Sequence, residues 1–418
     1  MLTLLFIIFL IANIYTPLSF HYAMIIDFLM LFFIKFGYKS TTIVVDKATS
    51  KALLVFLFYT FFVKIIMTGS WGMELSVDCS YFLLCSISFP YILNFFIDKK
   101  VDVLSAISVV LSMHCIIVIL EVFFPEIGMV IASFTDYNRE DIDRYLSLNY
   151  RKMGLAASFD TAGYFSVISS TVSILLFITR GKFFHFLLFI ISVVSSVWTS
   201  RSGMVLSVSS IIICLLFFKR QNIGINKITK AKTAILRVVV IIAVIFFGIN
   251  IILPIVGSEF GFETKESLLV SGIQEDYVEG SVEGLLSSHL KPLENLSLSE
   301  WLFGTGRSLR QMNLNYSSDI GYVRQIFQLG LVGLFFMLSV IFYNWQRARR
   351  FYNNYAFKKN NENASLLFFL FTLTILVLLF MNYKNYFLFN RGKFELYFLF
   401  YYLTLNYCIR GYHESITQ

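Results

Sequence analysis

Long apolar runs, separated by short polar segments, dominate this chain of 418 residues. A helix that crosses a lipid bilayer needs about 20 mostly apolar residues, and many of these runs approach that length. Only 14% of the residues are charged, whereas soluble domains carry about a quarter. We therefore predict an all-α, polytopic membrane protein.

We predict about twelve transmembrane helices, all within a single transmembrane domain, residues 1–418. The run Phe183–Phe218 is too long for one span, so it is expected to form a helical hairpin with its turn at Ser200–Ser202. Arg201 then lies in that turn. The expected spans are 2–17, 21–36, 52–70, 81–97, 103–124, 161–179, 183–199, 202–218, 237–253, 320–344, 364–382 and 393–409.

Lysine and arginine are concentrated in alternate connections, and this bias predicts the orientation of the chain. The connections around 219–237 and 346–362 are the most basic, and all the basic connections fall on one side when the twelve spans alternate. That side is predicted to be cytoplasmic, with both termini on it. The net charge of +8 is then mostly a topology signal, and we expect no nucleic-acid partner. The first run lacks a basic region and a small-residue cleavage site, which favours a retained span over a signal peptide.

Two sizeable loops are expected on the outer side. The first covers 125–160, and the larger, acidic one covers 254–319. Within the larger loop, the sequence Ser297-Leu-Ser-Glu300 matches a capping box, which predicts a short helix before Trp301. Loops of this length in compact folds are usually functional or disordered.

Charged residues recur near the predicted outer ends of the spans. Individually, each has an ordinary explanation, since Lys64 can snorkel, Glu121 can end a helix and Asp27 can pair with a neighbouring span. Outward arginines, however, run against the inside bias, and their recurrence favours a shared anionic ligand. They are Arg151, Arg201, Arg307, Arg324 and Arg391.

Three short motifs occur in a fixed order along the chain. They are Arg151-Lys-Met-Gly154, Thr199-Ser-Arg-Ser-Gly203, and the pair WLFGTGRSL (301–309) with SSDIGYVRQIFQLGLVG (317–333). Alone, GTGR lacks the spacing of a P-loop, and Gly330 and Gly333 are compatible with ordinary helix packing.

In this order and topology, the motifs resemble those of the O-antigen polymerase and O-antigen ligase superfamily of bacterial membrane glycosyltransferases. Ligases of that superfamily have a His-Asn pair at the start of the last motif, where this chain has Asp319 and Ile320. The difference favours a polymerase. It also weakens the transfer of the ligase histidine's role to Asp319.

The resemblance implies a multi-pass protein of the bacterial inner membrane. It further implies an enzyme that polymerises undecaprenyl-pyrophosphate-linked oligosaccharide repeat units at the periplasmic face, with a chain-length regulator protein as a possible partner. Arginines are expected to stabilise the pyrophosphate leaving group, with no metal and no cofactor. We predict Arg201 and Asp319 as catalytic residues, and as pyrophosphate or glycan ligands Arg151, Arg324, Arg307 and Arg391.

Two alternatives stay open. A flippase or transporter of lipid-linked oligosaccharides is compatible with twelve spans, although carriers usually show an internal repeat and midplane binding groups. An O-antigen ligase differs from a polymerase in its acceptor. The five cysteines are interpreted as small buried hydrophobic residues and not as a disulfide or metal framework.

Overall fold

The computed structural model describes a little over two thirds of the chain, and every regular element in that part is helical. The described residues are 1–15, 20–37, 45–69, 74–133, 152–156, 158–220, 289–307, 320–356, 362–384, 388 and 393–414. The predicted all-α class is confirmed for these residues. All five cysteines are free and buried, as predicted.

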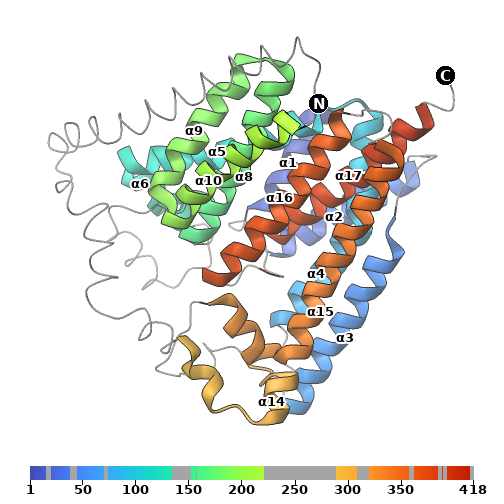
Figure 1. Ribbon diagram of the computed structural model, residues 1–418, viewed down its shortest axis with the longest axis vertical. Coiled ribbons are helices and arrows are strands. Elements are labelled where there is room, and N and C mark those ends of the chain that lie inside the picture. The colour runs from blue at the N-terminus through green and yellow to red at the C-terminus, as the bar shows by residue number, and fades with distance from the viewer. Residues whose placement is uncertain are drawn as a thin grey trace.

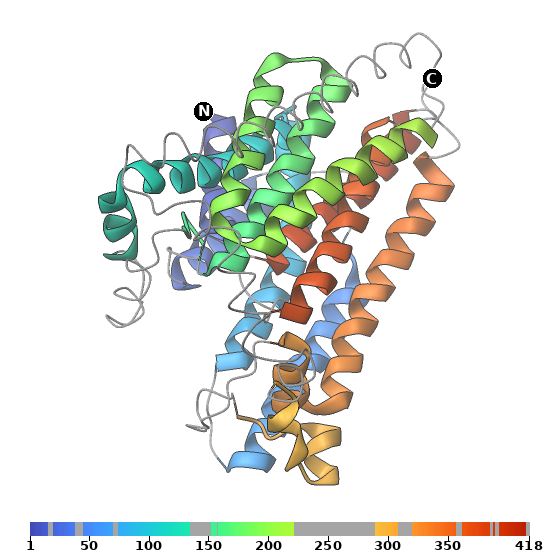
Figure 2. The same ribbon diagram turned by 60° about the vertical axis from the view of Figure 1, so that its left-hand side comes forward.

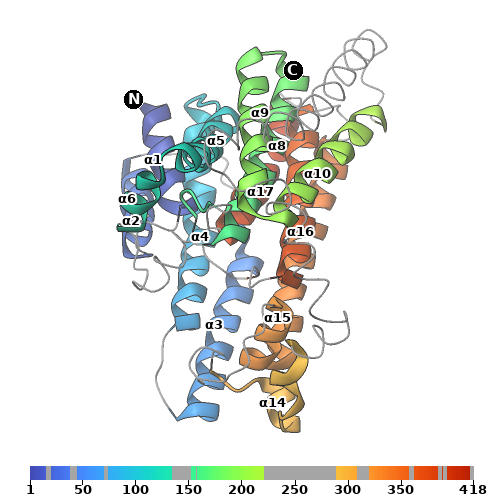
Figure 3. The same cartoon turned by 90° about the vertical axis from the view of Figure 1, so that its left-hand side faces the viewer.

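The helices pack into one elongated bundle (Figure 1). In chain order they are α1 (Leu2–Ile14), α2 (Phe20–Gly37), α3 (Lys47–Thr68), α4 (Glu74–Asp98), α5 (Val103–Phe123), α6 (Pro125–Ser133), α8 (Phe159–Arg180), α9 (Phe183–Thr199), α10 (Arg201–Arg220), α14 (Leu298–Phe303), α15 (Gly321–Phe351), a π-helical turn η3 (Tyr352–Ala356), α16 (Glu362–Lys384) and α17 (Phe394–Glu414). The first residues of α1 and the last of α17 lie at the same, upper end of the molecule (Figures 1 and 3).

A helix covers every predicted span except 237–253, which lies outside the described residues. Among the described helices, six are long and apolar enough to cross a membrane, namely α3, α4, α5, α8, α15 and α16. Three shorter apolar helices accompany them, at Leu2–Ile14, Phe183–Thr199 and Ser202–Cys214. The chain is thus a membrane protein by the length and composition of its helices, and the number twelve stays a prediction.

Helix α8 is the most deeply buried of the candidate spans, with 89% of its most apolar stretch buried. It packs against α5, α9 and α10, and α5 and α9 also contact each other. The green helices α8, α9 and α10 lie together in Figure 2. Buried serines join α5, α8 and α9 through hydroxyl–hydroxyl hydrogen bonds, which act as interhelical polar links inside a membrane. The pairs are Ser108–Ser173 (2.8 Å), Ser112–Ser169 (3.1 Å), Ser169–Ser192 (2.7 Å) and Ser166–Ser195 (3.0 Å).

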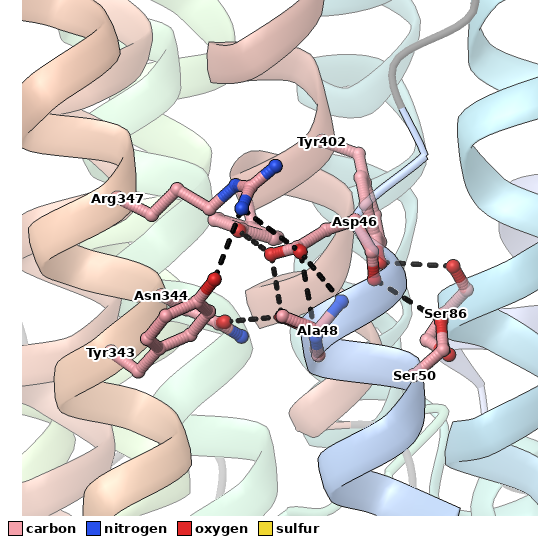
Figure 4. A network of polar contacts seen from close by, with 10 residues as sticks. Asp46, Ala48, Ser50, Ser86, Tyr343, Asn344, Arg347 and Tyr402 are labelled. Atoms are coloured by element: carbon pink, nitrogen blue, oxygen red, sulfur yellow. Dashed lines mark hydrogen bonds and ion pairs between the residues drawn. The ribbon is translucent and has the colours of Figure 1, made fainter.

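A second polar network joins α3, α4, α15 and α17 (Figure 4). Asp46 is fully buried at the N-cap of α3, where it accepts from the backbone N–H of Ala48 at 3.1 Å. Its carboxylate also pairs with Arg347 at 3.3 Å and accepts from the Tyr401 hydroxyl at 2.5 Å. Tyr402 extends the network by donating to the carbonyl of Ser86 at 2.9 Å. These contacts satisfy the buried charge internally.

Helix α15 is broken at Gly330, and this corrects the prediction of a single continuous span over 320–344. Gly330 has φ 67° and ψ −178°, which is not a helical conformation. The break exposes the last carbonyls of the first part of the helix, and such carbonyls need other donors. The backbone N–H of Thr305 donates to Phe327 at 2.8 Å, Gly306 N–H to Gln328 at 3.1 Å, and the Tyr59 hydroxyl to Leu329 at 2.6 Å.

The segment that caps this break is held by α14 and its neighbours. The predicted capping box is confirmed, since Ser297 accepts from Glu300 N–H while the Glu300 side chain accepts from Ser297 N–H. Leu293 and Trp301 then pack on Val323 and Phe327 of α15. The turn at 304–306 thereby lies between the break and the end of α3 (Figure 1).

Candidate functional site

A cluster of charged side chains gathers around Lys393, which directly precedes α17 and is 5% exposed. Asp160 from the first turn of α8, Arg324 from the first part of α15, and Glu395 from the first turn of α17 all act on its charge. These residues come from positions up to 235 apart in the sequence (395 minus 160). We call Asp160, Arg324, Lys393 and Glu395 the Lys393 cluster.

Hydrogen bonds fix the backbone around this cluster. The buried Tyr164 hydroxyl donates to the carbonyl of Lys393 at 3.2 Å, which ties α17 to α8. The buried side chains of Gln325 and Asn382 pair with each other at 3.1 Å, which ties α15 to α16. Gln325 also donates to the carbonyl of Leu388 at 3.3 Å. The start of α17 is therefore tied to α8, and the backbone at Leu388 is tied to α15.

The charges around Lys393 are of both signs. The carboxylates of Asp160 and Glu395 attract its ammonium group, and the guanidinium of Arg324 repels it. Ionisable groups that are buried between the helices of a membrane protein and pair with one another are typical of functional sites.

The α9–α10 hairpin lies at the same end of α8 as Asp160. Gly203 of α10 packs directly on Gly163 of α8, and a Cβ added at Gly203 would lie 2.7 Å from the Cα of Gly163. Ser200 fits against the same glycine, and its hydroxyl accepts from Gly203 N–H at 3.0 Å. Close glycine contacts of this kind let two membrane helices approach. The N-terminal ends of α8 and α10 are therefore side by side.

Helix N-termini converge in this region, namely those of α8, α10, α17 and the first part of α15. The N-terminal end of a helix carries partial positive charge and free N–H groups, both of which favour anions. The first-turn acids Asp160 and Glu395 offset part of that potential. Arg324 and Lys393 add to it.

The predicted site residues lie in different parts of the molecule. The predicted hairpin is present, but its turn is shorter than Ser200–Ser202: α9 ends at Thr199, and Arg201 is already the first residue of α10. The Arg201 side chain lies outside the described part. Arg324 belongs to the Lys393 cluster and is half-buried. Arg307 is exposed, in a turn that packs against α3 beside Val63 and Thr68. Outside the described residues lie Arg151, Asp319 and Arg391.

Lys393 and Asp160 were missed as site residues by reasoning from the sequence. Lys393 follows Arg391 within an apparently ordinary basic start of a span, and Asp160 is a common first-turn acid. The available signal was a lysine at the very start of the last predicted span, since a charge that faces other helices needs a partner.

Among the described residues, no group of three or more His, Cys, Asp or Glu side chains is arranged to hold a metal ion. The site geometry is therefore described by its cations, carboxylates and helix ends. No protein-family model matches the chain, and no curated protein matches it either.

Proposed function

We propose that this chain is a membrane glycosyltransferase that polymerises oligosaccharide repeat units carried on a polyprenyl pyrophosphate. The acceptor hydroxyl attacks the anomeric carbon of the donor, and a new C–O bond forms. The bond between that carbon and the phosphate oxygen breaks, and its electron pair leaves with the pyrophosphate. The hydroxyl proton passes to a carboxylate, for which Asp319 stays our candidate.

The observation that carries this proposal is the Lys393 cluster near the turn of the α9–α10 hairpin, where Arg201 lies. A departing pyrophosphate gathers negative charge, and fixed cations in a site shielded from water stabilise it strongly. Arg324 and Lys393 are two such cations, and the converging helix N-termini favour the same ligand. Arg201 begins one of those helices. The motif resemblance indicates the substrate class, and the cluster provides cations that suit its pyrophosphate leaving group.

The broken helix α15 bears on the transporter alternative. In many transporters, an interrupted helix leaves backbone carbonyls open to coordinate an ion or substrate. Here the carbonyls of Phe327, Gln328 and Leu329 already accept hydrogen bonds from neighbouring groups of the protein. This pairing favours a structural role for the break, and the enzyme remains the better proposal.

The test is polymer formation by purified protein in liposomes that contain lipid-linked repeat units. Wild-type protein should produce a ladder of longer glycans. Arg201→Lys should abolish polymer formation, because lysine cannot reproduce the planar fork of arginine. Arg324→Ala should abolish it because the variant removes the cation. Arg350→Ala is the matched control, since Arg350 is exposed at the other end of α15.

The outcomes separate the alternatives. Transport of the lipid-linked unit without elongation would establish a flippase instead. Elongation that requires a lipid A–core acceptor would establish a ligase. Full activity of well-folded Arg201→Lys and Arg324→Ala proteins would refute the assignment of these arginines to the leaving group.

A further inference from the structure

The short segment 152–156 is held in the bundle through its backbone. The N–H of Lys152 donates to the carbonyl of Trp198 at 2.7 Å. The N–H of Gly154 donates to the Glu121 carboxylate at 3.1 Å, and that of Leu155 donates to Nδ1 of His114 at 3.1 Å. Two side chains of α5 and one carbonyl of α9 therefore bind this segment.

Gly154 shows how closely the segment fits. Its φ is +55°, a conformation that favours glycine. A Cβ at this position would lie 2.7 Å from Val118 and 2.9 Å from the ring of His114. No larger residue fits without displacing α5 or the segment.

His114 is itself fixed in one tautomer. Because Nδ1 accepts the Leu155 N–H, the ring proton is on Nε2, which faces the carbonyl of Ala162 at 3.3 Å. The ring is fully buried between Tyr15 and Phe165, with centroid distances of 6.2 Å and 5.3 Å. This neutral histidine thus links α5, α8 and the segment at once.

The segment leads directly to the candidate site. Trp198, which accepts from Lys152, is the penultimate residue of α9, and Arg201 begins α10 three residues later. The Lys152 side chain is buried as well, and burial lowers its pKa while the negative charge of Glu121 raises it. Lys152 is therefore anchored at the hairpin.

We infer that His114 and Glu121 are positioning residues, which hold the segment 152–156, and with it Lys152, against the α9–α10 hairpin. Neither residue needs to touch the substrate. Their role is to fix the backbone so that Lys152 lies where an anionic lipid headgroup is bound. The link to substrate depends on the proposed function, whereas the anchoring of the segment does not.

The first measurement is hydrogen–deuterium exchange at the amides of Gly154 and Leu155 in detergent-solubilised protein. His114→Leu removes the acceptor and should speed exchange at Leu155 by about tenfold or more, since a lost hydrogen bond of about 1.4 kcal/mol corresponds to that factor. His114→Asn retains an acceptor at the position of Nδ1 and should restore protection. Ser112→Ala is the control, because Ser112 lies on the same helix and bonds Ser169 instead.

The second measurement is donor KM and kcat in the polymer assay. For His114→Leu, we expect donor KM to rise by about tenfold with little change in kcat, because a displaced Lys152 weakens binding of the headgroup. His114→Asn should restore KM. If His114→Leu fails to fold, two Glu121 variants replace it. Glu121→Met removes the acceptor of the Gly154 amide and Glu121→Gln keeps one, so exchange at Gly154 and donor KM are compared between them.

Unchanged exchange in His114→Leu, or an Asn variant as disturbed as the Leu variant, would overturn the positioning role. Faster exchange with an unchanged donor KM would overturn its link to the site. Faster exchange in a protein whose wild type forms no polymer would leave the anchoring intact and refute the proposed function.

Discussion

The backbone N–H of Thr305 donates to the carbonyl of Phe327 at 2.8 Å, so the end of one connection completes the hydrogen bonding of a broken helix. The Gly306 N–H and the Tyr59 hydroxyl donate to the next two carbonyls, those of Gln328 and Leu329. An uncapped helix end inside a membrane protein would leave polar groups without partners at a cost of several kcal/mol. The break in α15 and the turn at 304–306 therefore depend on each other.

The first prediction concerns Gly330. Replacing it with alanine puts a Cβ against the backbone of Leu302 and Phe303, at a φ of +67°. We expect Gly330→Ala to lower the stability of the protein by about 2 kcal/mol or more, since this φ alone costs about 1–3 kcal/mol for other residues. The thermal unfolding midpoint in detergent measures the effect. Gly37→Ala is the control, because a Cβ at Gly37 meets nothing within 4 Å.

A smaller loss is expected at Tyr59. Tyr59→Phe removes the hydroxyl that donates to Leu329 at 2.6 Å and retains the aromatic ring. We predict a loss of about 1 kcal/mol, the usual net contribution of such a hydrogen bond. The same unfolding assay checks it, and a Tyr59→Phe protein more stable than wild type would contradict the capping role of this hydroxyl.

The sequence predicts the helices well because bilayer thickness fixes their length and apolar composition. The hairpin turn follows from a run too long for one span, and the helix at Leu298–Phe303 follows from the local hydrogen bonding of Ser297 and Glu300. Each of these features is set by residues that are neighbours in the chain. That is why a reading of the chain alone recovers them.

The break at Gly330 and the Lys393 cluster could not be predicted in this way. The backbone of Leu302 packs so closely on Gly330 that no Cβ fits, and the sequence around Gly330 does not contain this neighbour. Asp160 acts on Lys393 because a hydrogen bond from Tyr164 ties α8 to the start of α17, and apolar faces alone do not specify which helices become neighbours. Arg324 was identified only because outward arginines oppose the charge bias.

The next prediction compares two aspartates that both cap helices and pair with arginines. Asp46 is fully buried and pairs with Arg347, whereas the Asp102 side chain is 47% exposed and pairs with Arg180. Removing one partner of a buried pair leaves an uncompensated charge and costs about 3–5 kcal/mol, while exposed pairs contribute about 0–1 kcal/mol. Loss of the cap adds about 1 kcal/mol in both cases.

We therefore expect Asp46→Ala to be less stable than Asp102→Ala by about 2 kcal/mol, after allowing for partial exposure of Arg347. The measurement is the unfolding midpoint of each variant in the same detergent. Equal losses would mean that the network in Figure 4 contributes no more than a surface ion pair.

The last prediction concerns the positive charge of Lys393. Its ammonium group interacts electrostatically with Asp160, Glu395 and Arg324, and the proposed leaving group needs fixed cations. Lys393→Met should raise donor KM by about tenfold or more, since a hydrogen bond to a charged group contributes about 1.5–3 kcal/mol. Lys393→Arg keeps the charge and should stay closer to wild type. The measurement is donor KM in the polymer assay, and a well-folded Lys393→Met protein with wild-type KM would show that Lys393 does not contact the donor's charge.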